Sequence, residues 1–195
     1  YLADGRLVPL LADYASPVIV DSYEGLDQIA TVFEDTPVVG ERKSVIVDLA
    51  AQTAAPLARW VKDSDLLPLM GEMGVTVNFW HVADAGKDSV DLLNRLVNTY
   101  SPGPNYIVVR NLGRSSDFTL LDESSALKKA LAMGGCVVTL PQLHEASMRK
   151  IDRQNASFWN AINHKSGPDA LGMLERQRVK TWLRGVYEVF DTLPL

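Results

Sequence analysis

The amino-acid sequence predicts an α/β fold, with a mainly parallel β-sheet flanked by helices on both faces. Short β-branched runs recur, and each is followed by a polar or small-residue turn and then by a stretch with helical spacing, which is the pattern of βαβ units. The runs are continuously apolar, as in strands covered on both faces. A composition of 47% hydrophobic and 22% charged among 195 residues is that of a globular domain.

Five apolar runs are the expected strands, and helical spacing fills the gaps between them. The strands are expected at 18–20, 45–47, 75–80, 106–109 and 136–140. Helices are expected at 26–33, 56–61, 64–70, 88–100 and 118–133, then from 142 to about 162 and from about 171 to 190. The sequence contains no internal repeat and no long linker, so we expect a single α/β domain over 1–195, with a C-terminal helix in 164–195.

Composition narrows the classes of function. A formal net charge of -5 argues against DNA binding by the whole surface, although a local basic patch remains possible. The single cysteine, Cys136, forms no internal disulfide, and no Cys/His cluster has metal-ligand spacing, so a reducing cytoplasm without zinc is the simplest setting. No apolar run approaches the roughly 20 residues of a membrane-spanning helix. Because the chain begins at Tyr1 rather than Met, we expect upstream residues in the native gene product.

The segment SVIVDLAAQT, residues 44–53, is the most informative one. It places Asp48 at the carboxyl end of an expected strand, where open α/β sheets bind their ligands. Such a carboxylate can hold Mg²⁺ through water, and the loop with Gln52 can sense a phosphate. The alternative, at about even odds, is that Asp48 caps the next helix or stabilises a turn.

Two further strands end in residues suited to a base pocket. YIVVRN ends at Asn111, whose amide offers a donor and an acceptor to a purine edge. VVTLP ends at Pro141, and we expect the carbonyl that precedes this proline to line the same pocket. Each also has a plainer interpretation, because Asn often forms turns and Pro often ends strands.

These three segments, in this order, resemble the ParA/MinD class of P-loop ATPases, and within it a branch linked to plasmid partition or mobilisation. The resemblance covers 17–163, and ASFWNAIN and LERQRVKTWL are also similar to that branch. It implies a P-loop NTPase-like, Rossmann-like three-layer fold and a cytoplasmic homodimer that binds ATP and Mg²⁺. It also implies that Asp48 is the Mg²⁺-associated acid, Gln52 a switch residue, Asn111 the base-contacting amide and Pro141 its neighbour.

One element of that class is missing from the sequence. A phosphate-binding loop needs G-x-x-x-x-G-K-[ST], but Gly86-Lys87 is followed by Asp88 and preceded at the required position by His81. We therefore expect the loop to lie upstream of this chain, which by itself should be inactive as an ATPase. The alternative is a non-catalytic interaction or scaffolding module on a degenerate fold of the same kind.

Two polar clusters complete the set of candidates. One combines His81 and Asp84 with Lys87 and Asp88 and is a candidate contact for a ligand or a partner subunit. Helix capping by Asp88 and a partly buried His81 are the plainer interpretation. The other is a cationic stretch of the last helix, where a solvated face is the default and a patch for DNA or an acidic partner is the functional alternative. Its members are Arg176, Arg178, Lys180 and Arg184.

Overall fold

The computed structural model describes residues 16–34, 43–50, 52–163 and 165–193. The chain divides into two compact units, Tyr1–Glu72 and Met73–Leu195, which are described separately. The expectation of one domain over 1–195 stays a prediction.

The described part of the first unit is helical. It contains α1 (Tyr23–Thr31), α2 (Ala54–Asp63) and α3 (Leu66–Glu72). The Ser22 hydroxyl accepts a 3.1 Å hydrogen bond from the Gly25 amide and so begins α1. The indole nitrogen of Trp60 donates to Asp27 at 2.8 Å and joins α2 to α1. The expectation of one or two short helices at 56–61 and 64–70 is confirmed as two helices. Helix α2 extends two residues further at each end, and α3 begins and ends two residues later than predicted.

The strands predicted at 18–20 and 45–47 are wrong. Both segments lack regular secondary structure, and Ile46 is 96% exposed. A run of three β-branched residues becomes a strand only where a neighbouring strand accepts its backbone hydrogen bonds. No described residue of the first unit lies in a strand, so the described residues supply no such neighbour.

The second unit contains a parallel sheet of three described strands in the order β1-β2-β3. The strands are β1 (Asn78–Ala83), β2 (Asn105–Asn111) and β3 (Cys136–Leu140). In the register, Asn111 at the end of β2 lies opposite Leu140 at the end of β3. The predictions for β2 and β3 are confirmed, whereas β1 begins three residues later than its predicted start at residue 75.

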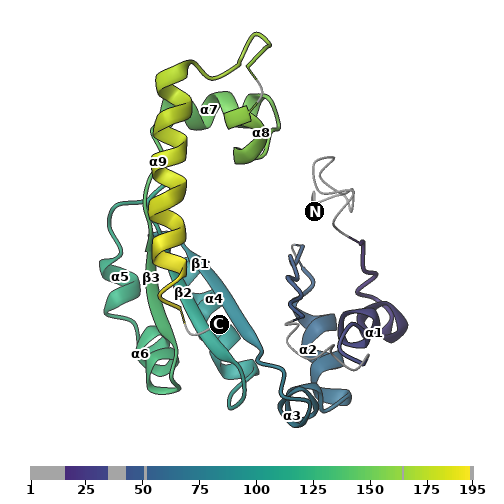
Figure 1. Cartoon of the computed structure of the whole chain (residues 1–195). Coiled ribbons are helices and arrows are strands. Elements are labelled where there is room, and N and C mark those ends of the chain that lie inside the picture. Colours follow the sequence, from purple (N-terminus) through teal and green to yellow (C-terminus); the bar gives the residue numbers. More distant parts are fainter. Residues whose placement is uncertain (1–15, 35–42, 51, 164, 194–195) are drawn as a thin grey trace. The chain divides into compact units, whose positions relative to one another are not determined.

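Helices cover both faces of β2, as its continuously apolar sequence predicted. One face packs against α4 (Lys87–Thr99), α5 (Thr119–Asp122) and α6 (Ser125–Ala132) through a core that includes Tyr106 and Val108. The opposite face packs its Ile107 and Val109 against the end of α9 (Met173–Phe190). Figure 1 shows α9 running alongside the sheet. The α/β class and the parallel sheet are therefore confirmed.

Local hydrogen bonding splits two of the predicted helices. The stretch 118–133 becomes α5 and α6, because the Ser124 hydroxyl accepts from the Leu127 amide at 3.1 Å and starts a new helix. The stretch 142–162 becomes α7 (Glu145–Arg153) and α8 (Phe158–Asn163). Between them Asn155 has φ of 48°, a left-handed conformation that ends α7. Helices α7, α8 and α9 enclose a second core, which contains Leu143 and Val179.

Strand β1 is less completely covered than β2. On the face that α9 partly covers, Trp80 is 41% and Val82 59% exposed. The Trp80 ring meets Phe190 edge to face, with ring centroids 5.5 Å apart. Within the described ranges, no helix has the length and apolar character needed to cross a membrane.

Candidate functional site

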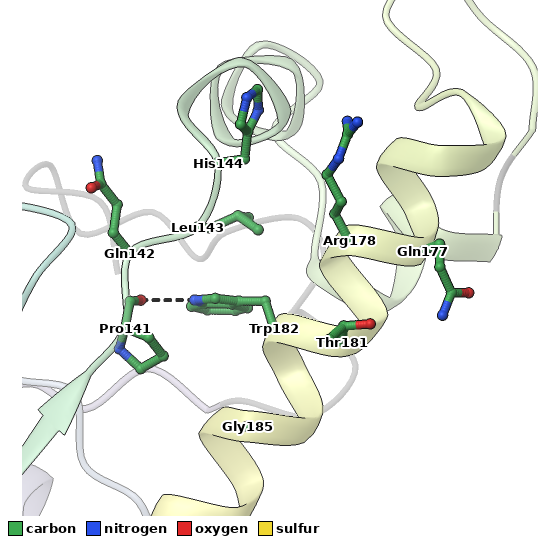
Figure 2. Close-up of a pocket in the computed structure, with 9 residues that line it drawn as sticks. All are labelled: Pro141, Gln142, Leu143, His144, Gln177, Arg178, Thr181, Trp182 and Gly185. Carbon is green, nitrogen blue, oxygen red and sulfur yellow. Dashed lines mark hydrogen bonds between the residues drawn. The ribbon is translucent and has the colours of Figure 1, made fainter.

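A pocket of about 510 Å³ lies at the carboxyl end of β3, between the loop that follows this strand and α9. The carboxyl ends of parallel strands are where open α/β sheets bind ligands, and the volume is in the range of small-molecule sites. Figure 2 shows the lining side chains. They are Pro141, Gln142, Leu143, His144, Gln177, Arg178, Thr181, Trp182 and Gly185.

Apolar groups form the floor of the pocket. The indole nitrogen of Trp182 donates a hydrogen bond of 2.7 Å to the carbonyl oxygen of Pro141, drawn as a dashed line in Figure 2. Phe158 packs against the indole, with ring centroids 4.9 Å apart. Leu143 is buried and belongs to the core of α7, α8 and α9. The floor is therefore held in place from both the strand end and the helices.

Polar groups form the rim. Within the part of the chain that the structure describes, the side chains of Gln142, His144, Gln177, Arg178 and Thr181 have no hydrogen-bond or ion-pair partner, and all five residues are exposed. The rim contains one permanent cation and no carboxylate. A ligand can therefore bind these side chains without displacing a hydrogen bond or ion pair within the protein.

The nearby acid, Glu175, is already engaged. Its Oε2 accepts hydrogen bonds from Lys150 Nζ and from the Gly172 amide, both at 2.7 Å. The Lys150 bond, followed by the Gly172 bond, lowers the pKa of Glu175, and the charge of Arg178 adds to this effect. Because Lys150 neutralises Glu175 directly, Arg178 keeps its N–H donors.

The two residues predicted for a base pocket lie at the same end of the sheet, but only Pro141 is among the residues that line the pocket. Pro141 lines the pocket, and Asn111 lies opposite Leu140 in the adjacent strand. The Asn111 Oδ1 accepts from the Gly113 amide at 3.0 Å and stabilises the turn after β2, as its plainer interpretation held. The carbonyl that precedes Pro141, that of Leu140, accepts a hydrogen bond from the Leu112 amide at 3.0 Å, and the carbonyl of Pro141 itself accepts from Trp182.

Asp48 and Gln52, the predicted Mg²⁺ and switch residues, lie in the first unit. Asp48 is exposed in a segment without regular structure, so its predicted place at a strand end is wrong. Gln52 has φ of 70° and comes just before Thr53, the N-cap residue of α2. Asn111 and Pro141 belong to the second unit, and the two pairs are described separately.

The four cations of α9 do not form one patch. Arg176 donates to the carbonyl of Leu171 within its own unit. Arg178 lines the pocket. Lys180 lies two residues later, about 200° around the helix, and shares a stripe with Arg184, four residues on. Arg176 lies four residues before Lys180 and so belongs to the same stripe, which leaves Arg178 on a different side of the helix. A basic patch made of the other three cations stays a prediction.

The cluster around His81 forms a compact turn between β1 and α4. The His81 Nε2 and the Ser89 hydroxyl are 3.3 Å apart, and the same hydroxyl accepts from the Asp84 amide at 3.3 Å. Burial lowers the pKa of His81, and Ser89 and Asp84 oppose this only in part. His81 is partly buried, as predicted, whereas capping by Asp88 is wrong, because Gly86 occupies the N-cap position of α4.

Several lining residues escaped the sequence reasoning. Leu143, His144 and Trp182 join the site only because α9 returns to the end of β3, with 41 positions separating Trp182 from Pro141. One signal was present in the spacing of Arg178, Thr181, Trp182 and Gly185, which follows one helical face. Gly185 leaves this face open, since a Cβ there would meet no atom within 4 Å.

The chain is an α/β protein with an open surface pocket at the carboxyl edge of a parallel sheet. Comparisons of the chain with protein-family models, with curated proteins and with solved structures find no match. Among the described residues, no group of three His, Cys, Asp or Glu side chains is placed to hold a metal ion.

Proposed function

We propose that this chain is the base-binding part of a nucleotide-dependent switch protein of the ParA/MinD type, acting in plasmid or DNA partition or mobilisation. The observation that supports it best is the pocket at the end of β3, which is lined by Pro141 and adjoins the strand that ends in Asn111. Its apolar floor suits a flat ring, and its rim offers both donors and acceptors to a base.

The remaining parts of the proposal concern a form of the protein that also contains a phosphate-binding loop. In that form, ATP would bind with Mg²⁺, which Asp48 would hold through water while Gln52 changes conformation with the γ-phosphate. A homodimer would then engage DNA or a DNA-processing protein.

The test is ATP binding and hydrolysis by the native-length gene product, compared with its Asp48→Ala variant and with this chain. Glu72→Ala is a matched control, since Glu72 is another exposed acid of the first unit. We expect hydrolysis by the native-length protein, a strong loss with Asp48→Ala and no change with Glu72→Ala. Hydrolysis that survives Asp48→Ala, or its complete absence from the native-length protein, contradicts the switch function.

A second candidate is a non-catalytic interaction or scaffolding module. It is favoured by the exposure of Trp80 and Val82 on β1, at 41% and 59%, since large exposed apolar side chains on a sheet mark surfaces that a partner can cover. Failure of ATP to bind the native-length protein would favour this candidate.

A further inference from the structure

The face of α9 that lines the pocket continues past the pocket toward the first turn of the helix. Its members recur at intervals of three or four residues and therefore lie on one side of α9. We call them the outer face of α9, and they are Leu174, Gln177, Arg178, Thr181, Arg184 and Gly185. Four of them line the pocket. Leu174 lies one turn before Arg178 and is 62% exposed, so an exposed apolar side chain extends the pocket along the helix.

The first turn of α9 holds two large apolar side chains in water. Met173 is 74% exposed and stands next to Leu174. This turn is fixed, because the Gly172 amide and Lys150 of α7 both donate to the Oε2 of Glu175 at 2.7 Å. Apolar side chains held rigidly beside a pocket with an apolar floor form a surface that a partner can cover.

Cations border this surface, and the outer face of α9 contains no acid. From residue 176 to residue 187, α9 contains four Lys and Arg residues and no Asp or Glu. Residues 142–185 contain eight Lys and Arg residues and four Asp and Glu residues, whereas the whole chain contains 19 and 24. The positive charge is therefore a property of this region rather than of one arginine. An apolar surface bordered by cations is complementary to an acidic partner that also carries apolar side chains.

The dimensions of the surface suit a helix. Trp182, in the floor of the pocket, follows Leu174 by eight residues, so the two lie about 12 Å apart along α9 at a rise of about 1.5 Å per residue. Apolar side chains that recur over two turns of an amphipathic helix have the same spacing. Figure 2 shows the floor between the end of β3 and α9. Grooves of this kind bind the apolar face of a helix.

Two other anionic partners fit this surface less well. The phosphate backbone of a nucleic acid has no apolar side chains with which to cover Met173 and Leu174. A lipid surface takes up the apolar face of a helix, but the apolar face of α9 is already packed inside the protein through Val179 and Val189. An acidic helix matches both the apolar and the charged part of the surface.

We propose that the outer face of α9, with Met173 and the adjoining pocket, binds an acidic amphipathic helix of a partner protein. The apolar side of that helix covers Leu174 and the floor of the pocket, and its carboxylates face Arg178 and Arg184. This docking goes beyond the proposed function and does not depend on ATP. Because the helix would cover the pocket, it and a base would exclude each other.

The experiment measures the binding of labelled peptides to the full 195-residue chain by fluorescence anisotropy, at about 0.15 M salt. The probe is a peptide of about 14 residues with leucines on one helical face and glutamates on the other. One control peptide has lysines in place of the glutamates, and another has the same leucines and glutamates in an order without an apolar face. We expect the leucine–glutamate helix to bind about tenfold or more tightly than either control.

Two substitutions separate the apolar from the charged contribution. Leu174→Gln should weaken the binding of the acidic helix about tenfold, since it removes an apolar contact and keeps a helix-forming residue. Its matched control is Leu92→Gln, because Leu92 is 51% exposed in α4. Arg178→Glu should also weaken binding about tenfold. Arg95→Glu makes the same change of charge at an exposed position of α4 and should leave binding unchanged.

Gly185→Leu provides a variant that fills the pocket without changing a charge. Its side chain would enter a region with no atom within 4 Å of the Cβ position, and leucine favours a helix more than glycine does. The variant should fold and bind the acidic helix less tightly than the unchanged chain does.

The docking site is overturned if the acidic helix does not bind, if all three peptides bind equally, or if Arg95→Glu and Leu92→Gln weaken binding as much as their counterparts in α9. Binding of a DNA duplex or of anionic lipid vesicles that Leu174→Gln and Arg178→Glu abolish, without peptide binding, would assign the surface to that partner instead. Peptide binding without ATP hydrolysis by the native-length protein keeps this site and removes the switch. Hydrolysis without peptide binding does the reverse.

Discussion

The indole nitrogen of Trp182 lies 2.7 Å from the carbonyl oxygen of Pro141, and this hydrogen bond joins α9 to the end of β3. The bond fixes the floor of the pocket by connecting two segments that lie 41 positions apart. It also satisfies a polar indole group inside a largely apolar contact with Phe158.

Trp182→Phe should lower the free energy of unfolding by more than about 1 kcal/mol, because it removes the hydrogen bond to Pro141 and also part of the indole that packs on Phe158. Urea unfolding measures this. Trp159→Phe is the control, since Trp159 is 69% exposed and should change the free energy by less than about 0.5 kcal/mol. Equal effects of the two substitutions would show that the Pro141 contact contributes nothing.

Glu175→Gln should destabilise the second unit by about 1 kcal/mol at neutral pH, since the charged bonds from Lys150 and the Gly172 amide weaken. The pKa of Glu175 is lowered in the folded state, so its stabilisation is present above about pH 4.5 and is lost as the pH falls through the folded pKa. Unfolding measured against pH should show a smaller acid loss in Glu175→Gln.

The matched control for Glu175 is Glu145→Gln. Glu145 pairs with Arg149 at 3.0 Å on the surface, with the two side chains 72% and 66% exposed, respectively. Water screens such a pair, so the substitution should change the free energy of unfolding by less than about 0.5 kcal/mol. A larger loss than with Glu175→Gln would contradict the special role of the α7–α9 contact.

His81 should make the second unit less stable below about pH 6.5. Burial lowers its pKa in the folded state, so the unfolded chain binds the proton first as the pH falls, and the free energy of unfolding decreases until the folded pKa is passed. Urea unfolding between about pH 7.5 and 5.5 should show this loss, and His81→Gln should remove it. The exposed His144 provides the control, because His144→Gln should retain the loss.

Ile46→Lys should change the free energy of unfolding by less than about 0.5 kcal/mol, because Ile46 is 96% exposed. Leu26→Ala in the same unit should cost about 2–5 kcal/mol, since Leu26 is 1% exposed. Thermal and urea unfolding compare the two. A cost for Ile46→Lys near that of Leu26→Ala would mean that 45–47 is buried as a strand after all.

The spacing of apolar residues predicted most helices and strands of the second unit, because the apolar side of each element there is the side that packs against its neighbours. Strands β2 and β3 and helices α4 and α9 lie close to their expected positions, since their apolar residues face the cores that the spacing implied. The failures at 18–20 and 45–47 have a different origin. A β-branched run shows only that its residues are compatible with a strand. Whether the strand forms depends on a neighbouring strand, and the run contains no information about that neighbour.

The site was predictable only in part, for a related reason. Pro141 and Arg178 were singled out from their own surroundings, and both line the pocket. His144 follows Pro141 on the loop and Trp182 follows Arg178 on α9, but no local pattern shows that these two segments come together. The patch for DNA or an acidic partner stays a prediction: Arg178 lies on another side of α9 than Lys180, whereas Arg176, Lys180 and Arg184 follow one another at intervals of four residues.

Helix α9 belongs to two hydrophobic clusters at once. Its Val179 packs with Leu143 among α7 and α8, while its Val189 packs against Ile107 of the sheet. Detaching α9 would therefore bring apolar surface of both clusters into contact with water. The sheet and the small helical cluster should consequently exchange their amide hydrogens as a single cooperative body, with α9 as the element that couples their opening.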